Sequence, residues 1–323
     1  MSATFREPRE GQNTNQNNKL CGSSATLRYG DRQQYIVGLG DIISASVLKI
    51  EQEFARDMSW TDWKGARYTL RDEFAYVTGA AKRLAGRTPG TRDTNNDGRT
   101  VDQFQELANA HIRSRRAAGH GLVLPEQYAL LRRAEVLAIR LYSGAAFQPI
   151  NSFLRQISAL TGEMRLQMAQ NVSLTFAATV GHLCSAIRKL SAVATPEEAR
   201  TPLFRGVRGK LSPEFWGTDD QGMVVATDTA FMSTSRNRRT PVAYMAEGEH
   251  NVLWELQPST ASDIAFHSGA DISMLSQYAG EDEVLFPPCT MLVCQESSIQ
   301  KRGEECQVDG KAFTAIRVEP HFI

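Results

Sequence analysis

The chain has 323 residues, which is enough for one large domain or two modest ones with a substantial apolar core. Its 36 Lys and Arg residues equal its 36 Asp and Glu residues, and this zero formal net charge argues against a nucleic acid or an anionic membrane as partner. Residues 1–18 are polar and no apolar run approaches the length of a membrane span, so we expect a cytoplasmic protein without signal peptide or transmembrane segment.

Five cysteines and six histidines are scattered without the spacing of a disulfide framework or a zinc site, which predicts free thiols and no bound metal. One stretch, 93–98, alternates oxygen-bearing side chains before a glycine, as at the start of a calcium loop. However, Phe104 stands where such a loop needs its bidentate acid. A polar turn is therefore the preferred interpretation.

Residues 1–30 are rich in Asn, Gln, Ser and Gly and predict a disordered polar tail, whereas 31–323 predict a folded domain. In the first part of this domain, 31–195, apolar residues recur at helical spacing. The pattern predicts a helical lobe, with helices expected at 43–54, 63–84, 126–141 and 163–194.

After Pro196, short apolar runs are broken by Gly, Pro and Asp, which predicts a β-rich core over 196–323. The expected strands are 203–209, 224–226, 230–234, 251–257, 284–286, 290–295 and 313–318. Helices followed by strands predict an α+β fold, in which a helical lobe packs on a sheet-rich core with a cleft between them.

Three stretches of the β-rich core carry reactive or ligand-binding side chains. Arg205 offers a fork of donors suited to a phosphate, and Gly206 allows a ligand to approach the backbone. Ser233 begins a run of three hydroxyl side chains, and Glu281 and Glu283 stand two residues apart. Taken alone, each stretch is better explained as an ordinary strand end or solvated turn.

The two glutamates suggest a specific chemistry. If 281–283 is extended, the period of two puts both carboxylates on one face and turns Asp282 the other way. Two converging carboxylates beside an aromatic residue and a glycine suit a reaction at a sugar carbon. One carboxylate stabilises developing positive charge while the other handles a proton.

The order of these stretches is more informative than any one of them. Arg205-Gly206, then Ser233-Thr234-Ser235, then Glu281-x-Glu283 resembles the arginine-type mono-ADP-ribosyltransferases. The resemblance covers roughly residues 199–323 and extends back to 142–155. There a tyrosine, an aromatic residue five further on, an asparagine four beyond that and then Leu-Arg look like the family's helical NAD-binding segment.

The resemblance implies a β-sandwich-like ADP-ribosyltransferase core with NAD as the substrate that occupies the cleft, and no metal. Arg205 would anchor the phosphate side of NAD, the Gly206 backbone would hold the nicotinamide amide, and Ser233 would support Glu283. Thr234 and Ser235 would have structural roles.

On the helical side, Tyr142, Asn151 and Arg155 would contact the cofactor. Phe147 stands where related toxins often carry tyrosine, so only stacking or packing is assigned to it.

By the same resemblance, Glu283 would hydrogen-bond the nicotinamide ribose and stabilise the cationic sugar. Glu281 would receive the guanidinium of an arginine on an acceptor protein, with Tyr278 as a wall for that acceptor. An NAD glycohydrolase with water as acceptor, and a catalytically silent NAD-binding or interaction module, are the two alternatives. Automodification is also open, because the chain contains many arginines.

Overall fold

The computed structural model describes residues 39–44, 49–62, 65–79, 99–121, 124–158, 160, 162–171, 175–209, 211, 213–218, 222–248, 250–258 and 269–321. The predicted tail, 1–30, and the calcium-like stretch, 93–98, lie outside these residues. Within the described part of the chain, no helix is both long and apolar enough to cross a membrane.

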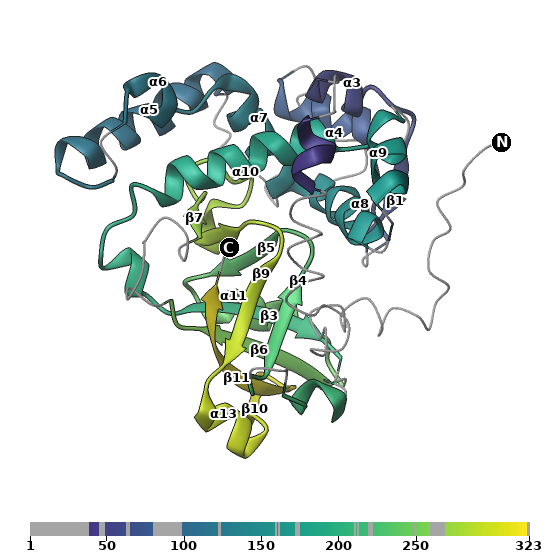
Figure 1. Ribbon diagram of the computed structural model, residues 1–323, viewed down its shortest axis with the longest axis vertical. Coiled ribbons are helices and arrows are strands. Elements are labelled where there is room, and N and C mark those ends of the chain that lie inside the picture. Colours follow the sequence, from purple (N-terminus) through teal and green to yellow (C-terminus); the bar gives the residue numbers. More distant parts are fainter. Residues whose placement is uncertain are drawn as a thin grey trace.

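Helices of the first half gather on one side of the strands, with α5 and α6 extending away from the rest (Figure 1). They are α3 (Ile50–Phe54), α4 (Leu70–Val77), α5 (Val101–Ala117), α6 (Glu126–Ala129), α7 (Arg133–Leu141), α8 (Phe147–Ser158), α9 (Gly162–Gln170) and α10 (Ala177–Ser191). Every residue of α7 from Glu135 onward is buried. A helix that is enclosed all round belongs to the centre of a domain, and α7 packs against α5 and α10 in this way.

A kink joins α7 to α8. The connecting segment, Tyr142–Ala146, has π-helical hydrogen bonding, and Gly144 has a non-helical backbone (φ −93°, ψ −161°). Such interruptions bend a helix sharply, often beside functional sites. Here the bend brings Tyr142 and Asn151, nine residues apart, into hydrogen-bond contact.

The second half forms a mixed sheet of nine strands among the described residues, in the order β4-β9-β11-β6-β3-β5-β8-β7, with β10 paired to β11. All neighbouring strands are antiparallel except β6 and β11. The strands are β3 (Leu203–Arg208), β4 (Val225–Asp228), β5 (Met232–Ser235), β6 (His250–Leu256), β7 (Ala270–Asp271), β8 (Glu283–Phe286), β9 (Thr290–Cys294), β10 (Glu304–Val308) and β11 (Lys311–His321). Short helices α11 (Arg239–Ala243) and α13 (Glu296–Lys301) connect some of them.

This sheet folds round its own core and also meets the helices. Ala226 of β4 and Val284 of β8 lie far apart in strand order, yet they belong to one buried apolar cluster. Leu285 points to the opposite face of β8 and joins the cluster formed by the helices, as does Phe231 just before β5. The α+β fold, with a helical lobe on a sandwich-like core, is therefore confirmed.

Three predicted helices are interrupted, and each interruption has a local cause. Residues 63–84 are not one helix, because a hairpin of β1 (Ser59–Thr61) and β2 (Arg67–Thr69) precedes α4. Trp60 and Tyr68 face each other across this hairpin, with ring centroids 5.8 Å apart. A cross-strand aromatic pair of this kind stabilises the extended conformation over the helical one.

The predicted helix 126–141 divides into α6 and α7, because the Asn109 side chain of α5 hydrogen-bonds both the N–H and the carbonyl of Leu131. Likewise 163–194 divides into α9 and α10. The Glu53 carboxylate accepts hydrogen bonds from the N–H groups of Ala178 and Thr179, at 2.8 and 3.0 Å, and so caps a new helix start. Long-range capping of this kind leaves no periodic pattern in the sequence.

Candidate active site

A local separation of two strands opens the site. β3 and β5 pair only at Phe204 and Ser235, whereas β3 pairs with β6 along its whole length. In place of a backbone partner from β3, the Ser233 carbonyl accepts a hydrogen bond from the Arg205 guanidinium at 2.9 Å. Arg205 and Ser233 thus border the slot between the strands, and their roles toward NAD stay predictions.

Gly206 lies at this slot. The Gly209 N–H bonds to His250 of β6, so antiparallel alternation directs the backbone groups of Gly206 away from β6 and toward the slot. A Cβ atom at Gly206 would lie 2.9 Å from the Pro241 carbonyl oxygen. The glycine is therefore required for α11 to pack on β3, and its contact with nicotinamide stays a prediction.

Asp228, at the end of β4, is the main polar residue that sequence reasoning missed. Its carboxylate is buried and accepts hydrogen bonds from Arg205 at 3.1 Å and from Arg155 of α8 at 3.2 Å. It also accepts the N–H of Ala230 at 3.0 Å. One carboxylate thus holds two guanidiniums side by side, and two neighbouring cations suit a diphosphate.

Tyr142 and Asn151 lie behind the site. Both are buried, the Asn151 amide donates to the Tyr142 hydroxyl at 3.1 Å, and the two side chains bond the backbone of Phe231. These contacts fix the start of β5 and therefore Ser233. The predicted cofactor contacts of Tyr142 and Asn151 stay predictions, as does the packing role of Phe147, which is 49% exposed.

Glu283 is buried, at 6% exposure. The Ser233 hydroxyl donates to one carboxylate oxygen at 2.7 Å, and the Ser276 hydroxyl approaches the other at 3.3 Å. Burial raises the pKa of Glu283 to about 7, and the Ser233 hydrogen bond acts in the opposite direction. Glu281 lies close enough that its charge also raises this pKa.

The three hydroxyls of 233–235 all donate to the acidic stretch. Ser233 contacts the Glu283 carboxylate, Thr234 contacts the Val284 carbonyl at 2.7 Å, and Ser235 contacts the Glu281 carbonyl at 2.6 Å. The run of hydroxyls is therefore a set of cross-strand ties that fixes both glutamates relative to β5.

The prediction that 281–283 is an extended strand, with Glu281 and Glu283 on one face, is wrong. Only Glu283 belongs to a strand, whereas Glu281 ends a 3-10 turn (Ala279–Glu281) and Asp282 has a left-handed backbone (φ 47°, ψ 50°). An aspartate tolerates this conformation better than most residues. The carboxylates are therefore brought together by a tight turn and not by strand alternation.

Glu281 is partly buried, and its carboxylate accepts a hydrogen bond from the Tyr244 hydroxyl at 2.5 Å. Burial raises the pKa of Glu281, and the bond from Tyr244 lowers it. Tyr278 lies near the same hydroxyl, because it contributes to the raised pKa of Tyr244. Both tyrosines therefore lie near Glu281, although only Tyr278 was predicted to be part of the site.

The helical lobe anchors the loop 272–282 that leads to these acids. Arg140 of α7 is 1% exposed, lies over the Phe104 ring at 4.1 Å and donates to the Leu275 carbonyl at 3.0 Å. In return, the Gln277 side chain donates to the Arg140 carbonyl at 2.6 Å, and its N–H bonds to the Ser143 hydroxyl. A buried charge with this many contacts holds the loop in one place.

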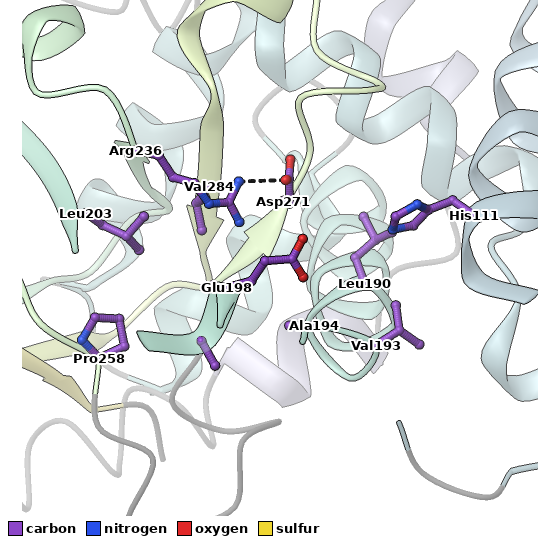
Figure 2. A pocket seen from close by; sticks show the side chains of 12 residues that line it. His111, Leu190, Val193, Ala194, Glu198, Leu203, Arg236, Pro258, Asp271 and Val284 are labelled. Atoms are coloured by element: carbon purple, nitrogen blue, oxygen red, sulfur yellow. Dashed lines mark hydrogen bonds and ion pairs between the residues drawn. The ribbon is translucent and has the colours of Figure 1, made fainter. Parts of the chain in front are cut away.

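The two ends of the loop are also tied to each other. The Arg236 side chain pairs with Asp271 at 2.6 Å (Figure 2). The Arg236 N–H bonds to the Asp282 carbonyl. The cavity in Figure 2 lies on the Val284 side of β8, opposite Glu283. Its volume of about 30 Å³ holds no more than a few waters, so it is too small for a dinucleotide.

A family model described as NAD:arginine ADP-ribosyltransferase matches residues 77–313. The chain belongs to this family. It is an NAD-dependent ADP-ribosyltransferase, and NAD is its substrate. No group of three or more His, Cys, Asp or Glu residues suited to a metal ion occurs in the described part of the chain.

Several solved structures of ADP-ribosyltransferases are similar to this one. HopU1 of Pseudomonas syringae pathovar tomato is 19% identical, with a TM-score of 0.44 over 77% of this chain and 95% of that one. The Vis toxin of Vibrio splendidus is 18% identical, with a TM-score of 0.39 over 70% and 89%. Plx2a, a toxin of Paenibacillus larvae, is 14% identical, with a TM-score of 0.40 over 68% and 96%. The search of curated proteins found no match.

Asp228→Asn should destabilise this ADP-ribosyltransferase by about 3 kcal/mol, because it leaves two partly buried guanidiniums without their shared counter-charge. Thermal unfolding measures the loss. Asp102→Asn, which removes an exposed partner of Arg133, is the matched control and should change stability by less than about 0.5 kcal/mol. Equal effects of the two variants would contradict the bracing role of Asp228.

Ser233→Ala should raise the pH midpoint of kcat/KM for NAD consumption by about one unit or more from its starting value near 7. The lost hydrogen bond stabilises the ionised form of Glu283, so without it the carboxylate stays protonated to higher pH. A pH series of NAD consumption measures the shift. Thr234→Val, whose hydroxyl contacts only a backbone carbonyl, should leave the midpoint in place.

Arg140→Met keeps the length of the side chain but removes its bond to the loop. We expect kcat for NAD consumption to fall about tenfold or more with little change in KM, because Glu283 loses its fixed position while the residues predicted to contact NAD are unchanged. Arg132→Met, on an exposed side chain just before the same helix, serves as control. A folded Arg140 variant with unchanged kcat would disprove the anchoring role.

Proposed function

We propose that the protein transfers ADP-ribose from NAD to an arginine side chain of an acceptor protein and releases nicotinamide. The observation that carries this proposal is the pair of unequal carboxylates at one turn. Glu283 is buried and tied to Ser233, whereas Glu281 is more accessible and lies beside two tyrosines. Such a pair suits one task at the sugar and another at the acceptor.

The sugar step needs a fixed negative charge. The bond from nicotinamide to ribose has a cationic leaving group, so it breaks without much acid help, and the main barrier is the oxocarbenium-like sugar. An ionised Glu283 beside the ribose would stabilise that cation where water is scarce. Arg205 and Arg155 would hold the diphosphate, and the Gly206 backbone would hold the nicotinamide amide.

The acceptor step explains the second acid. An arginine guanidinium stays protonated in water and is a poor nucleophile. Glu281 would bind it through two parallel hydrogen bonds and take one proton as a guanidinium nitrogen bonds to the ribose carbon that nicotinamide leaves. Neutral nicotinamide departs, the product guanidinium keeps its positive charge, and the proton passes from Glu281 to solvent.

NAD hydrolysis is the second candidate. Glu281 is only partly buried, so water has access to the same sugar carbon in the absence of an acceptor. A silent binding module is disfavoured, because Arg205, Ser233, Glu281 and Glu283 are all present and the Ser233–Glu283 hydrogen bond is formed. We place the whole reaction in one catalytic domain, 31–323, in which the lobe 31–195 supports the β-rich core 196–323.

Incubation with labelled NAD and an arginine-rich acceptor protein tests whether Glu283 acts on the sugar and Glu281 on the acceptor. Glu283→Gln should abolish both transfer and NAD cleavage, because the cationic sugar loses its counter-charge. Glu281→Gln should abolish transfer and retain part of the cleavage. Label on protein and free nicotinamide are measured in parallel.

Asp282→Asn is the matched control for this experiment, because it lies between the two acids, is exposed and keeps a residue that tolerates the left-handed backbone. It should behave like the wild type. Full transfer by Glu283→Gln would overturn the sugar step, and NAD cleavage without labelled protein in the wild type would favour the glycohydrolase.

A further inference from the structure

Tyr244 is exposed, yet the backbone that carries it is fixed by several side-chain hydrogen bonds. It follows α11, and the residue is 47% exposed. The Arg208 guanidinium donates to the Tyr244 carbonyl at 2.8 and 3.1 Å, and the Lys311 ammonium donates to the carbonyls of Val242 and Ala243 at 3.0 and 2.8 Å. Cations thus bind the last three carbonyls of this turn, which fixes the backbone that carries the tyrosine.

The other side of the turn is fixed as well. Pro241 of α11 packs directly on Gly206 of β3, where no Cβ atom would fit. The Tyr244 side chain therefore projects from a rigid support, and its hydroxyl lies 2.5 Å from a carboxylate oxygen of Glu281.

We propose that Tyr244 is a positioning residue for the arginine acceptor: its hydroxyl holds the Glu281 carboxylate in the one orientation that receives a guanidinium. This inference rests on the function proposed above. A carboxylate has about four acceptor positions on its two oxygens, so one bond from tyrosine leaves room for two parallel bonds from a guanidinium. Without the tyrosine, the carboxylate rotates and the paired geometry is lost.

Protonation favours the same assignment. Burial and the adjacent Glu281 carboxylate raise the pKa of Tyr244, so its hydroxyl remains a donor throughout the working pH range. The titratable groups that face this hydroxyl are Glu281, Glu283 and Tyr278. Its hydrogen bond lowers the pKa of Glu281 against the effect of burial and so keeps that carboxylate ionised for the guanidinium.

Tyr244→Phe removes the hydroxyl and keeps the ring, which makes it the direct test. Agmatine, a small molecule with one guanidinium, is the acceptor. We expect KM for agmatine to rise roughly tenfold to a hundredfold, the usual effect of losing a hydrogen bond to a charged group. NAD hydrolysis without agmatine should stay within about twofold, because Glu283 is untouched.

The pH profile is a second measurement, because its midpoint would not shift if Tyr244 had only a structural role. In Tyr244→Phe the midpoint of agmatine modification should shift upward, because Glu281 loses the bond that lowers its pKa. The midpoint of NAD hydrolysis should not shift. Tyr128→Phe, which removes an exposed hydroxyl on α6, is the matched control and should show neither change.

The outcomes separate this inference from the one on which it rests. A wild type that cleaves NAD but never modifies agmatine would overturn the proposed arginine transfer, and the role of Tyr244 with it. A wild type that modifies agmatine, beside a Tyr244→Phe variant with the same KM and pH midpoint, would overturn the tyrosine alone. An equal loss of hydrolysis and transfer in that variant would also overturn it, because the hydroxyl would then serve NAD.

Discussion

The carboxylate of Glu283 is buried, and its hydrogen-bond partners are neutral hydroxyl groups and not cations. Among the described residues, only the hydroxyl groups of Ser233 and Ser276 donate to it, and no lysine or arginine forms an ion pair with it. An ion pair would lower the pKa and neutralise the charge before a cationic sugar forms. Hydroxyl donors leave the charge available, which is the condition for electrostatic stabilisation of a transition state. The ties from 233–235 and from the lobe serve to keep that carboxylate in place.

Polar contacts from the helical lobe reach three different segments of the β-rich core. Arg155 reaches the end of β4 at Asp228, Tyr142 reaches the backbone just before β5, and Arg140 reaches the loop before β8. Each contact ends at a residue beside a predicted catalytic group. The lobe therefore does more than cover apolar surface, because its removal would release the segments that carry Arg205, Ser233 and Glu283.

The strands could be predicted from the sequence, because apolar alternation is a local pattern. The convergence of Arg205, Ser233 and Glu283 could also be predicted, because the three motifs occur in a characteristic order. The contributions of Asp228 and Tyr244 could not be predicted, because no local pattern marks them. Asp228 bonds Arg155, 73 residues away in the chain, and Tyr244 bonds Glu281, 37 residues away. Two of the three broken helices have the same origin, because the distant side chains of Asn109 and Glu53 bond the backbone where a new helix begins. The left-handed turn at Asp282 also overrides the periodicity that predicted one face for both acids.

A raised pKa does not by itself identify a catalytic acid in this protein. Burial raises the pKa of Glu53 to about 7 as well, yet its oxygens are occupied by the start of α10. Glu283, in contrast, combines the raised pKa with a position at the slot between β3 and β5. Both pKa values in the folded protein lie above the ordinary glutamate value of 4.5, so the stability that these groups contribute is fully present below pH 4.5 and is lost as pH rises through about 7. The proposed mechanism requires the ionised Glu283, so the pH range that would favour catalysis is the one in which these two buried carboxylates weaken the fold.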